Sequence, residues 1–125
     1  MSTRCCVKVM RDFENDRKEI VTLYHHHDGY PSGVGFDLLK RSEKWKNGNY
    51  PWDIDTIVNS LIKDDKDEYE YTAYNHSDIE YMYIINCNKK TIKCYECVWV
   101  YEDKYGRTVN INVMSKEVKI EDKEK

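Results

Sequence analysis

The chain has 125 residues, of which 34% are charged, and its formal net charge is -3. This length predicts a single domain, 1–125, with one modest core, and the charge balance lacks the basic excess of a DNA- or RNA-polymer binder. No apolar run approaches the ~20 residues of a membrane span, and the polar N-terminus predicts no signal peptide. We therefore expect a cytoplasmic protein without membrane contact.

Periodicity of the apolar residues predicts six strands and two helices. In chain order the expected elements are strands 3–11 and 18–27, helices 33–46 and 52–63, and strands 69–75, 80–87, 91–101 and 107–114. The first strand would place Cys5, Val7 and Val9 on one face. The pattern predicts an α+β fold, an antiparallel β-sheet with two consecutive helices packed on one face. The charged segment 115–125 predicts a flexible tail.

The stretch YHHHDGYPSGVGFDLL joins the second expected strand to the first helix. Asp28-Gly29 and Tyr30-Pro31 are turn pairs, because glycine supplies a positive φ and proline fixes φ. Ser32 predicts a helix N-cap. Exposed amides among the small residues at such a helix start can hold a phosphate. The alternative is a strand-turn-helix joint whose glycines serve geometry alone.

Three consecutive histidines open this stretch. Because side chains alternate along a strand, His25 and His27 would point to one face and His26 to the other. Histidine serves as a metal ligand, a catalytic base or a hydrogen-bonding wall. The sequence fixes no third metal ligand and marks no nucleophile. We therefore expect no metal, no cofactor and no catalytic residue, and favour a polar pocket wall or an ordinary hydrogen-bonded histidine.

Five cysteines without a signal peptide predict reduced thiols. The Cys94-x-x-Cys97 spacing matches half of a redox or zinc motif. It lies in a β-rich run, whereas a redox pair belongs at a helix start, and no second ligand pair follows it. Buried or interface thiols are the favoured interpretation.

Eleven tyrosines are the compositional oddity, since tyrosine suits interfaces and base stacking. Some of these rings would pack between the sheet and the helices, and others would stack a nucleobase. Arg107, beside the turn residue Gly106, either clamps a phosphate or is a surface charge. Among the tyrosines, two pairs would each lie on one face of a predicted strand: Tyr69 with Tyr71, and Tyr81 with Tyr83.

The sequence resembles the phage-encoded Thoeris anti-defence proteins. The shared features are two N-terminal strands, the HHHDGYPSGVG segment, two helices, and a tyrosine-rich sheet that ends near YGRTVNINV. The similarity is to the first-described signal-sponge type and covers about residues 3–114. It implies a protein that is not an enzyme. Such proteins bind and sequester a cyclic ADP-ribose isomer made by bacterial TIR-domain enzymes, without cleaving it, in the cytoplasm of the infected host. Related members also hold cyclic oligonucleotides at a separate site.

The resemblance further implies homodimers or hexamers with the nucleotide at a subunit interface, held by an aromatic ring, an amide and arginines. The ring matches Tyr81 or Tyr83, the amide Asn86 or Asn88, and the arginine Arg107. With the strand-to-helix segment, the expected ligand-binding residues are His25, His27, Asp28, Tyr30, Ser32, Gly33, Val34, Gly35, Tyr81, Tyr83, Asn86, Asn88 and Arg107. Two other functions stay open: an enzyme that cleaves a cyclic nucleotide signal with His25 or His27 as base, and a module that binds a host protein through its tyrosines.

Overall fold

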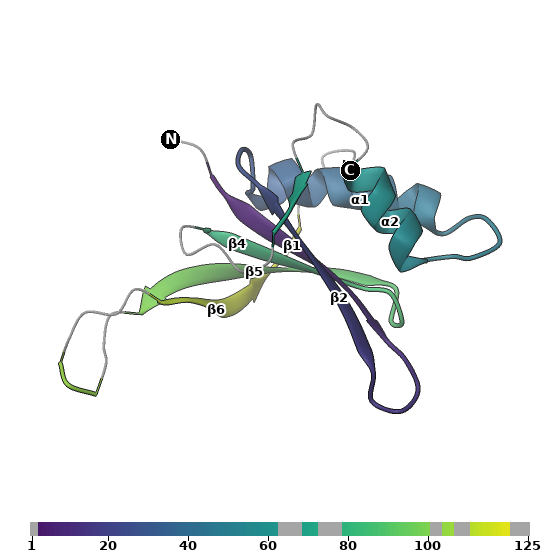
Figure 1. Cartoon of the computed structure of the whole chain (residues 1–125). Helices are drawn as coiled ribbons and strands as arrows, with labels where there is room; N and C mark the ends of the chain where they lie inside the picture. Colours follow the sequence, from purple (N-terminus) through teal and green to yellow (C-terminus); the bar gives the residue numbers. More distant parts are fainter. Residues whose placement is uncertain (1–2, 63–68, 73–78, 101–103, 107–110, 121–125) are drawn as a thin grey trace.

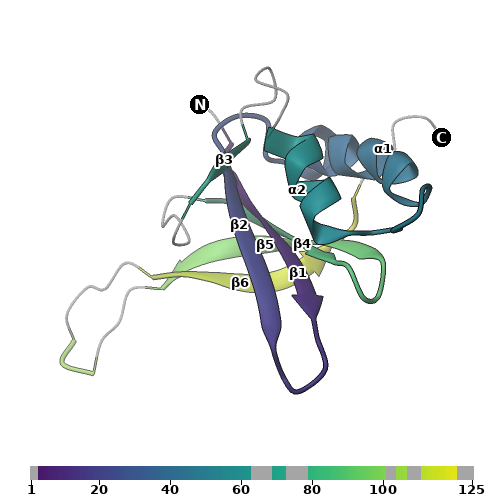
Figure 2. The same cartoon turned by 45° about the vertical axis from the view of Figure 1, so that its right-hand side comes forward.

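The computed structural model describes residues 3–62, 69–72, 79–100, 104–106 and 111–120. Within these ranges six strands, two α-helices and one π-helical turn form an α+β fold. The elements are β1 (Cys5–Asp12), β2 (Lys18–His25), η1 (Pro31–Gly35), α1 (Phe36–Trp45), α2 (Ile54–Ile62), β3 (Tyr69–Tyr71), β4 (Tyr81–Asn86), β5 (Thr91–Val100) and β6 (Ile111–Val118). Figures 1 and 2 both show α1 and α2 lying side by side.

The strands form one sheet in the order β3-β2-β1-β4-β5-β6. Neighbouring strands run antiparallel except β1 and β4, which run parallel. The prediction of a purely antiparallel sheet is therefore wrong at this pair. In the chain, β2, both helices and β3 lie between β1 and β4, which is ample length for the crossover that a parallel pair requires.

The main core joins alternate residues of the central strands to apolar residues of both helices. Cys5, Val7 and Val9 of β1 are fully buried, and all of their partners on β2 and β4 except His25 belong to the same cluster or pack against it. This confirms the predicted face of the first strand. The helical members of the cluster are Leu38, Trp45, Ile54, Ile57, Val58 and Leu61. A smaller cluster contains Cys6, Ile79 and Met82.

The first helix begins without the predicted serine cap. The π-helical turn Pro31–Gly35 precedes α1, and neither element has a side-chain cap hydrogen bond. Ser32 therefore lies inside the turn, one residue after its first position. Proline opens this turn because it has no N–H to leave without a partner in the first turn of a helix.

The second helix begins at Ile54, two residues later than predicted. Asp53 Oδ2 accepts the N–H of Thr56 at 3.1 Å, as an N-cap residue does. Trp52 precedes this cap with φ +56° and so cannot belong to the helix. Its ring packs edge-on against Trp45, with the two centroids 5.6 Å apart.

The last strand extends further toward the C-terminus than the sequence pattern indicated. β6 spans Ile111–Val118 and pairs with β5, and Ile120 packs against the main core. Residues 115–118, which the sequence pattern assigned to a flexible tail, therefore belong to this strand. Part of the strand predicted at 107–114 and the end of the predicted tail, namely 107–110 and 121–125, lie outside the described residues.

Candidate functional site

The segment between β2 and η1 is fastened to the sheet around Gly29. Its N–H donates to the Thr3 carbonyl at 2.9 Å, and its carbonyl accepts the Tyr83 hydroxyl at 2.7 Å. A Cβ on Gly29 would lie 2.8 Å from Cys5 Cβ, so only glycine fits there. The positive φ of this turn falls on Asp28, at +53°, and not on Gly29 as expected. Gly29 therefore serves close packing.

Gly33 and Val34 use their amides inside the same segment. The Gly33 N–H donates to the Tyr30 carbonyl at 2.9 Å, and the Val34 N–H donates to the Asp28 carbonyl at 2.8 Å. A Cβ on Gly33 would overlap that Asp28 carbonyl oxygen. A phosphate at the helix start needs exposed amides, whereas these two already have acceptors. The contacts favour the alternative in which Gly33 shapes the chain.

Gly35 and Tyr83 belong to the core. Tyr83 is 0% exposed, and burial is the main cause that raises the pKa of its hydroxyl above the ordinary value. A Cβ on Gly35 would lie 3.3 Å from the Tyr83 ring and 2.9 Å from Ile120 Cγ2. Because Tyr83 presents no exposed ring face, the expectation that it stacks a nucleobase is wrong. Tyr81 is partly buried against the same core.

Five of the predicted ligand residues do converge on one pocket. We call it the Asp28 pocket, and its volume is about 220 Å³. Its lining combines two carboxylates with one imidazole and one hydroxyl, so it offers mainly hydrogen-bond acceptors. The lining residues are His25, Asp28, Ser32, Gly33, Val34, Phe36 and Asp37.

A hydrogen-bonded network supports the wall of the Asp28 pocket. The Tyr69 hydroxyl and Arg41 Nε both donate to Asp37 Oδ2, at 3.0 and 2.8 Å. The Tyr69 ring also packs against the ring of the buried His25, with centroids 4.6 Å apart. Burial, and next the Asp37 carboxylate, raise the pKa of Tyr69, so its hydroxyl stays a donor at neutral pH. The network holds His25 and Asp37 in place.

His27 and Tyr30 lie outside the pocket lining, on the exposed surface. β2 ends at His25, and the His27 ring meets the His26 ring edge-on with centroids 4.7 Å apart. The Tyr30 hydroxyl donates to Asp28 Oδ1 at 3.1 Å, and this hydrogen bond raises the pKa of Tyr30. Tyr30 therefore lies next to the pocket through its contact with Asp28.

Asn86 and Asn88 lie at the C-terminal end of β4, and their side chains form hydrogen bonds with backbone groups. Asn88 accepts the Asp12 N–H at 2.7 Å and donates to the Asp12 carbonyl at 2.9 Å. Asn86 Oδ1 accepts the Lys89 N–H at 3.0 Å. The structure therefore does not bring either amide to the Asp28 pocket. Arg107 lies outside the described residues.

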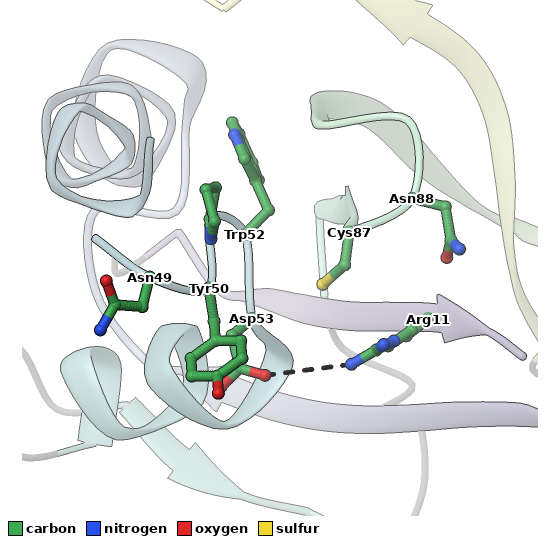
Figure 3. A pocket seen from close by; sticks show the side chains of 8 residues that line it. Arg11, Asn49, Tyr50, Trp52, Asp53, Cys87 and Asn88 are labelled. Carbon is green, nitrogen blue, oxygen red and sulfur yellow. Dashed lines mark ion pairs between the residues drawn. The ribbon is translucent and has the colours of Figure 1, made fainter. Parts of the chain in front are cut away.

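A second pocket, which we call the Arg11 pocket, lies between the end of β1 and the α1–α2 connection (Figure 3). Its volume is about 320 Å³. The sequence pattern did not predict a site in this connection, although two aromatic residues on either side of a proline, Tyr50-Pro51-Trp52, were a usable signal. The lining residues are Arg11, Asn49, Tyr50, Pro51, Trp52, Asp53, Cys87 and Asn88.

The cysteines of the Cys94-x-x-Cys97 spacing pack in different clusters. Cys94 belongs to the main core, and Cys97 packs against the smaller cluster. Burial raises the pKa of Cys94 to about 12 and that of Cys97 to about 11, so both thiols are neutral at pH 7. The expectation of a buried thiol is confirmed for Cys94. Among the described residues, no group of three or more His, Cys, Asp or Glu side chains is arranged to hold a metal ion.

No protein-family model matches the sequence, and no curated protein or solved structure matches it either. Across the part of the chain that the structure describes, no helix is long and apolar enough to cross a membrane.

Proposed function

We propose that this protein binds a cyclic ADP-ribose isomer made by bacterial TIR-domain enzymes and sequesters it without cleaving it. Holding the signal would block Thoeris anti-phage defence in the cytoplasm of an infected bacterium. The observation that carries the proposal is the convergence of residues from the HHHDGYPSGVG segment on the Asp28 pocket. This is the segment in which the resemblance is most specific.

The chemistry of the Asp28 pocket suits the nucleoside part of such a ligand. Ribose hydroxyls and the adenine amino group are hydrogen-bond donors, and the carboxylates of Asp28 and Asp37 are charged acceptors in the lining. Hydrogen bonds with one ionised partner are roughly twice as strong as neutral ones. The phosphates would be repelled by these carboxylates, so we place them outside the pocket.

The size of the Asp28 pocket supports a site shared between two copies of the chain. Its volume of about 220 Å³ is below the roughly 300–1,000 Å³ of typical ligand pockets. A ligand that carries an adenine, two riboses and two phosphates would therefore be held only in part by one chain. A second copy in a homodimer or hexamer would cover the remainder and supply the cations for the phosphates, since a self-complementary dimer is the commonest assembly.

The same proposal includes both helices covering one face of the sheet. Its support is that Leu38 of α1 and Ile57 of α2 belong to one cluster with Val7 of β1. Because residues two apart on a strand share a face, the β1 members of this cluster lie on a single side. That arrangement would place the start of the helical segment over the end of β2, where the Asp28 pocket lies.

Calorimetric titration with the cyclic ADP-ribose isomer tests the proposal, using Asp28→Asn as the decisive variant. Asparagine tolerates the positive φ of Asp28, so the change removes the charge and keeps the backbone. We expect affinity to fall about tenfold, because the charge-assisted hydrogen bonds are lost. Asp16→Asn is the matched control, since Asp16 is exposed and has φ +60° in the β1–β2 turn. Wild-type affinity in Asp28→Asn, or no binding by the wild type, would overturn the proposal.

A further inference from the structure

The Arg11 pocket contains one cation and one anion that face each other. Arg11 Nη1 lies 3.9 Å from Asp53 Oδ1, and Figure 3 shows the two side chains pointing toward one another. Their side chains are 42% and 27% exposed, so the pair is solvated and contributes little to stability. Burial raises the pKa of Cys87 to about 11, so this thiol adds no charge at pH 7. The charged groups of the lining therefore cancel.

Both charges are held in position by contacts outside the pair. The Arg11 guanidinium carbon lies 4.8 Å from the centroid of the Phe13 ring, a cation–π contact. Asp53 Oδ2 accepts the N–H and the hydroxyl of Thr56, each at 3.1 Å, while Oδ1 faces Arg11. A ligand would find these groups already oriented, which lowers the entropy cost of binding.

An exposed aromatic ring completes the lining. Tyr50 is 79% exposed, and its carbonyl accepts the Asp53 N–H at 3.2 Å. Trp52 has φ +56°, which is rare for a bulky residue, and its N–H donates to the Trp45 carbonyl at 2.8 Å. Strained backbone of this kind concentrates at functional sites. These backbone hydrogen bonds hold the turn in place, and the Tyr50 side chain extends from it into solvent.

We propose that the Arg11 pocket is a binding site for an aromatic α-amino acid. The ligand's carboxylate pairs with Arg11, its ammonium pairs with Asp53, and its ring packs on Tyr50. A purely anionic ligand would be repelled by Asp53, and a purely cationic ligand by Arg11. The volume of about 320 Å³ lies within the roughly 300–1,000 Å³ of small-molecule sites. This site is separate from the Asp28 pocket, and the proposal does not rest on the proposed function.

Titration with L-phenylalanine and two single-charge analogues tests this site, with tryptophan fluorescence or calorimetry as the readout. Phenethylamine lacks the carboxylate, and 3-phenylpropionate lacks the ammonium. We expect L-phenylalanine to bind and each analogue to bind about tenfold more weakly or worse, because each loses one charge-assisted contact. Equal binding of an analogue, tighter binding of the uncharged nucleoside adenosine, or no binding of L-phenylalanine would overturn the proposal.

Variants assign the two ends of the ligand. Asp53→Asn keeps a capping oxygen for α2 and removes the anion, so L-phenylalanine and 3-phenylpropionate should then bind equally. Tyr50→Ala should weaken L-phenylalanine binding roughly tenfold, whereas Tyr105→Ala, another exposed tyrosine at 67%, should not. Because Tyr50 and Tyr105 are both exposed, these two proteins should fold alike. An undiminished preference for L-phenylalanine in Asp53→Asn, or equal affinity in Tyr50→Ala and wild type, would contradict the assignment.

Discussion

The Tyr83 hydroxyl joins the segment after β2 to the sheet, so Tyr83→Phe should destabilise both the fold and the Asp28 pocket. This hydroxyl donates to the Gly29 carbonyl at 2.7 Å, and the side chain is fully buried. Removing the donor leaves a buried carbonyl without this partner, which costs about 1–3 kcal/mol. At this chain length, 1 kcal/mol lowers Tm by roughly 3–5 °C. A mid-range loss of about 2 kcal/mol therefore lowers Tm by about 6–10 °C.

Thermal unfolding followed by circular dichroism measures this effect, with Tyr105→Phe as the control. Tyr105 is 67% exposed, so loss of its hydroxyl should change the free energy of unfolding by less than about 0.5 kcal/mol. Cyclic ADP-ribose titration of Tyr83→Phe below its Tm should show weaker binding, because the segment that carries Asp28 is less firmly held. A Tyr83→Phe protein that melts within about 1 °C of the wild type would refute the reasoning.

Four further predictions follow from the packing, the titrating groups and the proposed assembly. Gly35→Ala should lower the free energy of unfolding by about 1–3 kcal/mol, because its Cβ would lie 2.9 Å from Ile120 Cγ2; an unchanged urea midpoint would contradict this. Burial raises the pKa of Tyr69 and Tyr83 above 10.0, so above pH 10 the unfolded chain loses these protons first. The free energy of unfolding should then fall by up to about 1.4 kcal/mol per pH unit for each tyrosine, and a urea midpoint that stays constant from neutral to strongly alkaline pH would disprove the linkage. Light scattering should give the mass of a dimer or a multiple of it. A strict monomer that binds one ligand per chain would contradict the proposal that a second copy of the chain covers part of each ligand. A chelator should leave Tm unchanged, since we expect no bound metal, and a fall that zinc restores would show otherwise.

The strands of the central sheet could be predicted because alternation is a local property of the chain. Val7 and Val9 are buried on one face, as their spacing indicated. The parallel pairing of β1 with β4 could not be predicted, because strand order depends on the path of the helices between them. The start of α2 was misplaced for a local reason, since the pattern does not reveal that Trp52 takes a positive φ.

The two pockets show the same division between local and long-range information. The density of turn residues around Asp28 and Gly33 marked the Asp28 pocket in advance. The sequence could not show that the Val34 amide donates to the Asp28 carbonyl, because this bond depends on the exact course of the loop. The Arg11 pocket escaped prediction because Arg11 and Asp53 meet only through tertiary packing.

Recovery of intact ligand from the protein tests the central claim of sequestration most directly. Purified protein in molar excess is incubated with the cyclic ADP-ribose isomer and filtered, and the retained protein is then heat-denatured and its released contents are analysed by chromatography and mass spectrometry. We predict that the ligand disappears from the filtrate and returns chemically unchanged after heating. A ligand that returns altered would indicate an enzyme, and a ligand that is never depleted would indicate that the protein does not bind it; either result would contradict sequestration.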